Sequence, residues 1–136
     1  MIREIVKDMF FLSRKSEKVT KDDLSIVDDL MDTLKANQQR CVGMAANMIG
    51  FNKNVIAFYD DKLLCIMLNP VITKTKGSYK CEEGCLSLEG IRQTERYHEI
   101  TVTYEDMNFH KHTKKYTGYT AQIIQHEIDH LKGIII

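Results

Sequence analysis

Five residues near the end of the chain, His126-Glu127-Ile128-Asp129-His130, have the types and spacing of a metal-dependent hydrolase site. Residues four positions apart lie on one face of a helix, so the two imidazoles can bind one metal ion. Glu127 follows the first histidine and is placed to act as general base toward a water that the metal activates. The same string also occurs on solvated helices, so its context decides between the two interpretations.

A catalytic site of this type needs a third protein ligand and an open position for water. In one known arrangement the third ligand is a histidine six residues after the second, but here that position is Ile136. Cys85, in the segment Glu83-Gly84-Cys85-Leu86-Ser87, is the best upstream candidate because a thiolate binds Zn²⁺ and Fe²⁺ strongly. Gly84 would allow the backbone to approach the metal closely.

Two other interpretations of this cysteine stay open. Cys85 alone fits a small buried thiol. Cys81 and Cys85 are four apart, as are His126 and His130, so these residues also fit a closed Cys₂His₂ structural site. The gap of about 40 residues between the two pairs far exceeds compact finger spacing, and a structural site has no use for Glu127.

Composition limits the classes of protein that the chain can belong to. With 136 residues it is long enough for one core, and we expect residues 1–136 to form a single domain. The 19 basic and 19 acidic residues balance, which gives no signal for a nucleic-acid or membrane partner. No apolar run is long enough to span a bilayer, and the N-terminus does not resemble a signal peptide, so the expected location is the cytoplasm. There, the four cysteines are expected as thiols or metal ligands.

Periodicity predicts the elements that must position these residues. Residues 20–37 have an apolar stripe and a capping box of Thr20 and Asp23, which predicts a helix. Residues 54–59 and 63–68 predict a hairpin, and residues 99–105 alternate as a further strand.

The C-terminal third is predicted to contain the helix that carries the histidines. This helix should run over residues 120–132 and end at Gly133, after which residues 133–136 resemble the start of a final strand. The basic residues 110–115 fit a solvated loop or the edge of a sheet. Strands followed by one late helix indicate an α+β domain.

Three segments, taken together and in order, resemble the motifs of the peptide deformylase family. Residues 41–50, CVGMAANMIG, resemble its first motif, G-x-G-x-A-A-x-Q. Residues 83–87 match its second motif, EGCLS, at every position, and residues 125–130 match its third, QHExDH. The resemblance covers about residues 40–136, and it implies antiparallel sheets packed around a central helix that bears the HExxH string.

The resemblance also implies a reaction and a metal. Cys85, His126 and His130 would bind one divalent ion, Fe²⁺ or Zn²⁺, with Ni²⁺ or Co²⁺ as substitutes. Glu127 would take a proton from water and pass it to the leaving amine. The reaction would remove formyl from the formylmethionine of new polypeptides, so the expected partners are nascent chains at the ribosome in a bacterial cytoplasm.

Further residues take roles from the same resemblance. The backbone N–H of Leu86 would face the developing oxyanion. Glu83 would support a ligand and would itself be held by an arginine, with Arg96 as our choice and Arg92 as the other option. The residues expected at the substrate are Gly43, Met44, Met48 and Gly84, with Ile123 and Ile124 beside the methionine pocket.

The sequence departs from the family pattern at two positions. Met48 stands where the motif has glutamine, and a thioether has no proton to donate to an oxyanion. Asn47 could donate instead only if the register shifted. Cys41 replaces the first glycine of the motif and adds a thiol near the cleft.

These departures leave three functional interpretations. The chain is an active deformylase, a related amidase with altered N-acyl specificity, or a non-enzymatic relative that keeps the metal and binds peptides. An intact Glu127 disfavours the third interpretation, because binding alone does not need a general base.

Overall fold

A computed structural model describes residues 1–136 of the chain. Three α-helices, two 3₁₀ helices and five strands are present. Along the chain these are α1 (Met9–Leu12), η1 (Lys21–Asp23), α2 (Leu24–Ala36), β1 (Gly43–Ala45), η2 (Ala46–Ile49), β2 (Val55–Asp60), β3 (Leu63–Cys85), β4 (Leu88–Glu105), β5 (Lys111–Thr117) and α3 (Gly118–Leu131).

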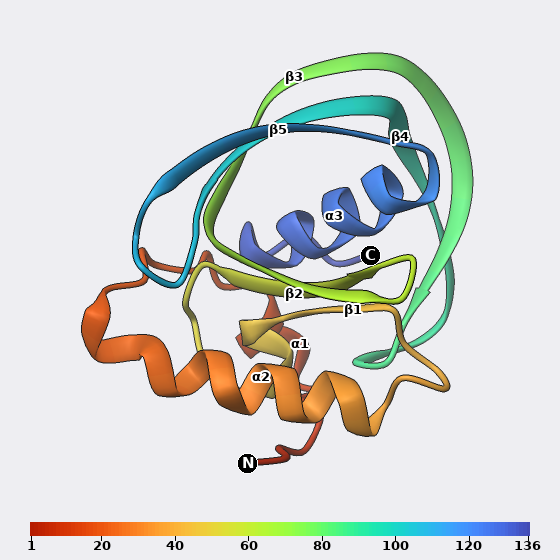
Figure 1. The fold of residues 1–136 in the computed structure, drawn as a ribbon. Helices are drawn as coiled ribbons and strands as arrows, with labels where there is room; N and C mark the ends of the chain where they lie inside the picture. Colours follow the sequence, from red (N-terminus) through yellow and green to blue (C-terminus); the bar gives the residue numbers. More distant parts are fainter.

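The five strands form one sheet in the order β1-β2-β3-β4-β5, with every neighbouring pair antiparallel. The long strands β3 and β4 arch over α3, while β1 and β2 pass on its other side (Figure 1). The β3–β4 register shifts at three places, including the step between Glu83 and Cys85. Such bulges add local twist and bend to a strand, which helps a single sheet curl around a helix.

Helix α3 occupies the centre of this curled sheet, as the family resemblance implied, although the strands form one sheet rather than several (Figure 1). It contacts β1 and β2 at one end of the strand order and β4 and β5 at the other. Helix α2 lies on the far side of β1 and β2 from α3 (Figure 1). The central helix is therefore enclosed, which is why its side chains are buried on most sides.

Helix α2 confirms the helix predicted for residues 20–37, except that its first turn is the 3₁₀ helix η1. The carboxylate of Asp23 accepts a hydrogen bond from the backbone N–H of Thr20, 2.9 Å away. Val27, Leu30 and Leu34 have no exposed surface, so the predicted stripe faces the core. One cluster of buried residues joins this stripe to the sheet and to α3.

The hairpin predicted for residues 54–59 and 63–68 is present in β2 and β3, but the strands that contain residues 63–68 and 99–105 are longer than expected. Residues 63–68 are only the start of β3, and residues 99–105 are only the end of β4. Between these ends, most residues of the β3–β4 hairpin are exposed, so hydrophobic alternation cannot reveal them. Of the basic stretch 110–115, all residues except His110 fall in β5, at the edge of the sheet.

The final strand expected at residues 133–136 is absent, which corrects that prediction. Gly133 adopts a φ of 77° and ends α3, and the backbone N–H of Ile134 then donates to Asp129. Ile136 is 6% exposed. Ile134 remains exposed, so only the end of the apolar run packs against the domain, and no part of the run pairs with a strand. None of the helices combines the length and apolar character that crossing a bilayer requires.

Candidate active site

Helix α3 carries both histidines of the HExxH string toward the end of β3. The Nε2 atoms of His126 and His130 lie 3.0 Å apart. His130 has no exposed surface, and His126 is 8% exposed. Because the two residues are one helical turn apart, their rings converge on a single point.

Gln125 fastens this helix to the sheet. Its Nε2 donates to the carbonyl of Tyr97 at 2.9 Å, and its Oε1 accepts from the N–H of Tyr97 at 2.8 Å. The side-chain amide of Gln125 thus satisfies both the N–H and the carbonyl of Tyr97, a residue of β4. It therefore fixes the position of α3 on the strand that leads away from the Cys85 turn.

Cys85, at the end of β3, completes the group. One ligand atom from each of Cys85, His126 and His130 lies within 4.8 Å of the other two. Cys81 does not join them, since its Sγ lies 3.7 Å from Glu83 Oε2 and 3.6 Å from Gln122 Nε2. The geometry thus assembles Cys-His-His and leaves out the second cysteine of the Cys₂His₂ alternative.

The chemistry of this group fits a divalent transition metal ion. Two imidazole Nε2 atoms at 3.0 Å cannot both carry a proton, so at least one lone pair points into the site. Glu127 Oε1 and His130 Nδ1 are buried without a hydrogen-bond partner. One sulfur and two imidazole nitrogens are donors that suit Zn²⁺ or Fe²⁺.

Burial and neighbouring charge separate the pKa values of the two histidines. Burial lowers the pKa of His130 to about 3, and the charge on His126 acts in the same direction. Burial also lowers the pKa of His126, but hydrogen bonds with Cys85 and Glu83 outweigh it and raise the value to about 10. A metal at this site would displace the proton of His126, because a ligating imidazole is neutral.

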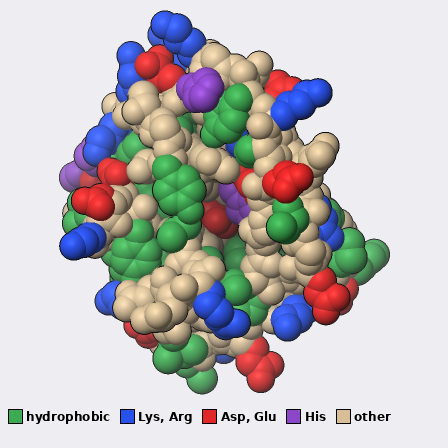
Figure 2. All heavy atoms as spheres, turned by 90° about the vertical axis from the view of Figure 1, so that its right-hand side faces the viewer, with side chains coloured by type: hydrophobic (Ala, Val, Ile, Leu, Met, Phe, Trp, Pro, Cys, Tyr) green, Lys and Arg blue, Asp and Glu red, His purple; other side chains and the backbone are tan.

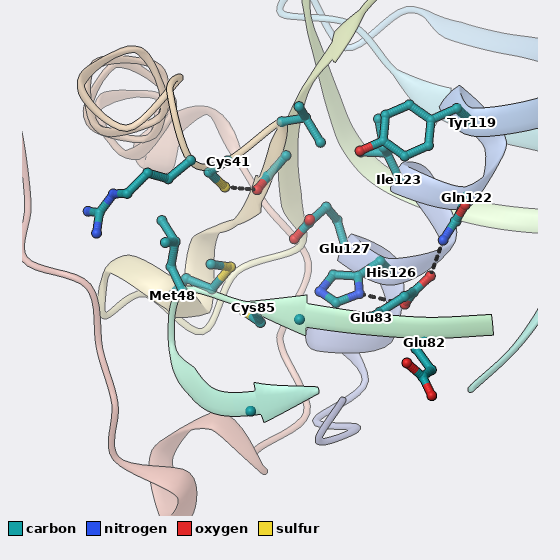
Figure 3. Close-up of a pocket in the computed structure, with 16 residues that line it drawn as sticks. Cys41, Met48, Glu82, Glu83, Cys85, Tyr119, Gln122, Ile123, His126 and Glu127 are labelled. Atoms are coloured by element: carbon teal, nitrogen blue, oxygen red, sulfur yellow. Dashed lines mark hydrogen bonds and ion pairs between the residues drawn. The ribbon is translucent and has the colours of Figure 1, made fainter. Parts of the chain in front are cut away.

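A buried ionic network supports His126 from behind. Its Nδ1 lies 2.8 Å from Glu83 Oε1 (Figure 3). The guanidinium of Arg96 lies 2.7 Å from Glu83 Oε1 through Nη2 and 2.7 Å from Asp129 Oδ2 through Nη1. Arg92, the other option, faces Glu83 in the strand register but donates to the carbonyl of Glu89.

Electrostatics keep Glu83 ionised in this network. Burial alone would raise the pKa of its carboxyl, but hydrogen bonds from His126, Arg96 and Gln122 outweigh burial and lower the pKa to about 2. An ionised carboxylate on Nδ1 fixes one proton of His126 on that nitrogen, so the proton that a metal would displace is the one on Nε2, which would then offer its lone pair to the site.

Glu127 lies next to the histidines and faces the same cavity (Figure 3). It is 5% exposed, and burial raises the pKa of its carboxyl to about 7. A carboxylate with a pKa near neutrality can both accept and return a proton, which is what a general base and acid requires.

A cavity of about 540 Å³ opens beside this cluster. Figure 2 shows it as a hollow in which carboxylate and histidine side chains lie behind an apolar rim. Of the residues predicted to face substrate or oxyanion, those that line it are Gly43, Met48, Gly84 and Leu86.

Met44 differs from that expectation, because it lies in the core with no exposed surface. Adjacent residues of a strand point to opposite faces, so Gly43 faces the cavity and Met44 faces the core. Likewise Ile123 lines the cavity, whereas Ile124 is wholly buried in the core.

Gly43 brings the wall of the cavity unusually close to α3. A Cβ at this position would lie 2.7 Å from Ile123 Cγ2 and 2.9 Å from Glu127 Oε2. Both distances are shorter than real carbon contacts, so no larger residue fits without displacement. The glycine therefore keeps the space beside Glu127 narrow.

The two departures from the motif lie in the same wall (Figure 3). The Met48 sulfur accepts a hydrogen bond from the N–H of Ala45 at 3.5 Å. Asn47 does not line the cavity, since its buried amide donates to the carbonyl of His130. The Cys41 thiol donates to the carbonyl of Gly43, and burial raises its pKa to about 12.

Tyr119, Gln122 and Asp129 are among the residues around the site that sequence reasoning missed. Tyr119 and Gln122 line the cavity, and Asp129 binds Arg96. Helical spacing could have found Gln122, which is four positions before His126. Asp129 belongs to the third motif itself, but nothing in the sequence connects it with Arg96.

Comparisons with known proteins agree with this geometry. A family model described as polypeptide deformylase matches residues 2–136. A curated peptide deformylase of Clostridium beijerinckii is 55% identical over 136 residues, which are 100% of both chains. A peptide deformylase structure from Legionella pneumophila superposes with a TM-score of 0.88 at 30% identity, over 99% of this chain and 83% of that one. A Met-Ala-Ser-bound deformylase from Acinetobacter baumannii has a TM-score of 0.89 at 25% identity, over 99% of this chain and 97% of that one.

Proposed function

The chain belongs to the polypeptide deformylase family, and we propose that it is a metal-dependent hydrolase that removes formyl from the formylmethionine of newly made polypeptides. Members of this family use a catalytic metal and act on N-formyl peptides. The observation that carries the proposal is the convergence of Cys85, His126 and His130 to within 4.8 Å beside a buried carboxylate, Glu127.

Cys85, His126 and His130 would hold one divalent ion. Such an ion supplies Lewis acidity, which polarises the formyl oxygen and makes water a better nucleophile near neutral pH. We propose Fe²⁺ or Zn²⁺, because a thiolate with two imidazoles suits both and because magnesium and calcium prefer oxygen ligands.

Glu127 is the proposed proton carrier. Its carboxylate takes a proton from the attacking water as the oxygen adds to the formyl carbon. The same proton then goes to the amine nitrogen as the C–N bond breaks. The immediate products are formic acid and a peptide with a free N-terminal methionine amine. Formic acid then loses its proton, which the amine takes up at neutral pH, so formate and an N-terminal ammonium result and atoms and charge balance without another reactant.

Leu86 is the proposed donor to the developing oxyanion, through its backbone N–H. It follows Cys85 directly and lines the cavity. Met48 adds no second donor, since its sulfur is itself an acceptor from Ala45. The loss of one such donor typically costs about 10²-fold or more in turnover, so we expect a slow deformylase.

The narrow space beside Glu127 supports selection of formyl over larger acyl groups. Gly43, Ile123 and Glu127 are so close that even one added carbon on Gly43 would clash. Acetyl carries one more carbon than formyl and should therefore be a poorer substrate. Apolar surface from Ile123 and the ring of Tyr119 suits a methionine side chain.

Nascent chains are the natural source of formylmethionine, so we propose them as the substrate. Association with the ribosome and a bacterial cytoplasmic location remain predictions. Co-sedimentation of the protein with translating ribosomes would test the first of these directly.

Formate release from a formyl-Met-Ala-Ser peptide tests the proposed function. Protein loaded with Fe²⁺ in the absence of oxygen should release formate, and Glu127→Ala should lose nearly all activity while it still binds metal. An acetyl-Met-Ala-Ser peptide should not be hydrolysed. Activity on the acetyl peptide alone would favour the altered-amidase alternative, for which Met48 is the specific reason. Metal binding without hydrolysis of either peptide would contradict both enzymatic interpretations.

A further inference from the structure

We infer that Gln122 is a positioning residue for the metal ligand His126, acting through Glu83, and that it connects the substrate cavity to the metal site. The inference rests on the proposed function and goes beyond it, since Gln122 lies outside all three motifs that suggested the site. The hydrogen bond between Gln122 and Glu83 connects the cavity wall to the carboxylate that contacts His126.

The contact comes from the spacing of residues on α3. Gln122 is four residues before His126, so both side chains leave the same helix face. Figure 3 shows the two side chains reaching the same carboxylate of Glu83. Gln122 Nε2 lies 2.9 Å from Glu83 Oε2, and His126 Nδ1 lies 2.8 Å from Glu83 Oε1. One carboxylate thus receives a donor from each of two consecutive helical turns.

Arg96 occupies the remaining side of the same carboxylate. Its Nε donates to Glu83 Oε2 at 3.0 Å, and its Nη2 donates to Oε1 at 2.7 Å. Gln122 and Arg96 therefore hold Oε2 between them. If the Gln122 amide were removed, Oε2 would keep only Arg96 Nε and the Cys81 thiol, a weak donor 3.7 Å away. The carboxylate could then rotate away from His126.

Gln122 differs from Arg96 in also facing the cavity. It lines the cavity together with Ile123 and Tyr119, whereas Arg96 is buried behind Glu83. A substrate side chain that binds beside Ile123 and Tyr119 would lie next to Gln122. Because Gln122 both lines the cavity and hydrogen-bonds to Glu83, it connects the cavity wall with the carboxylate that orients His126.

Carboxylates that orient a ligating histidine typically change metal affinity or activity by about 10- to 100-fold when they are removed. Gln122 is one step further from the metal and leaves Arg96 in place. We therefore expect Gln122→Leu, which keeps the size but removes the donor, to weaken Zn²⁺ binding by about 3- to 10-fold. Gln122→Glu places a second carboxylate against Glu83 and should weaken Zn²⁺ binding further than Gln122→Leu does.

The experiment measures Zn²⁺ affinity by competition with a chromogenic chelator, in the parent and in both variants. Gln93→Leu is the matched control, because Gln93 is exposed on β4 and lines no part of this cavity. The control should keep the parental affinity. Gln122→Leu affinity within twofold of the parent would overturn the inference, and so would an equal loss in Gln93→Leu.

Kinetics with two substrates separate positioning from simple packing. A positioning role predicts that Gln122→Leu lowers kcat with both formyl-Met-Ala-Ser and formyl-Ala-Ala-Ser at saturating Zn²⁺. A pure packing role would instead change KM for the methionine peptide and leave both kcat and Zn²⁺ affinity unaltered, which would overturn the inference. Because the affinity measurement needs no turnover, it stands even if the parent protein releases no formate.

Discussion

Asn47 donates a hydrogen bond from its side-chain Nδ2 to the backbone carbonyl of His130, 2.8 Å away. The two residues are 83 positions apart in the chain, and both have no exposed surface. This bond joins η2, which contributes Met48 to the cavity wall, to the turn of α3 that holds a proposed metal ligand. A buried hydrogen bond on the side away from the cavity therefore fixes η2, and with it the cavity wall, to helix α3.

Asn47→Ala should destabilise the domain. The variant loses one buried hydrogen bond and leaves a small void, while the unpaired Oδ1 of Asn47 is removed as well. We expect a loss of about 1–2 kcal/mol in the free energy of unfolding, measured by urea denaturation. Asn108→Ala is the control, since Asn108 is exposed in the β4–β5 turn and should change the free energy by less than about 0.5 kcal/mol. A variant as stable as the parent would show that the Asn47 bond contributes nothing net.

Met48→Gln should raise turnover of the formylated peptide. A glutamine amide restores a donor at the cavity wall, where the thioether now only accepts from Ala45. We expect kcat to rise by about 10- to 100-fold with a smaller change in KM, because the donor acts mainly on the transition state. Met48→Leu is the matched control and should stay near the parental rate. Equal rates in the parent and Met48→Gln would mean that another group already serves the oxyanion.

Cys85→Ser and Cys81→Ser should differ sharply in metal content. Cys85 lies with the two histidines, whereas Cys81 contacts Glu83 and Gln122 instead. Elemental analysis after dialysis should find close to one metal per chain in Cys81→Ser and little in Cys85→Ser. Loss of the metal from both variants would revive the Cys₂His₂ structural site.

The parts of the site that sequence alone could place are the ones set by local spacing. Two histidines four apart on a helix must share a face, and three short motifs in order add Cys85 from a distant strand. The pairing of Arg96 with Glu83 could be chosen only between two arginines. The structure shows why the choice mattered, because Arg92 is opposite Glu83 in register but binds Glu89 instead.

Patterns in the sequence could not predict the long-range contacts or the exposed parts of the strands. Nothing in the pattern connects Asn47 with His130, or Asp129 with Arg96, because each pair meets only after the sheet has curled around α3. The central part of the β3–β4 hairpin has no apolar face, so no periodicity marks it. The run of isoleucines after Gly133 suggested a strand, whereas in the structure it pairs with no strand and only Ile136 is buried.

The turn after β4 should respond to acid. Hydrogen bonds from His112, then from the backbone of His110 and Asn108, lower the pKa of Asp106 to about 2. A carboxyl whose pKa is lower when folded stabilises the fold above its unfolded pKa of about 3.9, and this contribution is lost as the pH falls toward 2. The difference in unfolding free energy between the parent and Asp106→Asn should therefore be largest above pH 4 and shrink steadily toward pH 2. A difference that stays constant over this range would show that the carboxylate charge is not involved.

Gly133→Ala should be among the most damaging single-methyl additions in the chain. Gly133 has a φ of 77°, and a Cβ there would lie 2.3 Å from the backbone oxygen of Ser13. The Cβ would be attached directly to backbone at the end of α3, and the Ser13 oxygen is itself a backbone atom. The two segments are held together, because the backbone N–H of Ser16 donates to the carbonyl of Leu131. An alanine at this position therefore fits only if the end of α3 or the N-terminal segment around Ser13 is displaced.

Gly90→Ala is the control that separates the two expected effects of Gly133→Ala, steric clash and backbone strain. Gly90 has a similar φ of 79°, but a Cβ there would meet nothing within 4 Å. Its substitution should cost about 1 kcal/mol in the free energy of unfolding, which is the left-handed strain alone. Gly133→Ala should cost at least about 1–3 kcal/mol more, because the strain is then joined by overpacking. Because the displaced end of α3 carries His130, the extra loss should be accompanied by weaker Zn²⁺ binding. Equal losses of stability in the two variants would mean that Ser13 moves aside freely and that the end of α3 is not held where the structure places it.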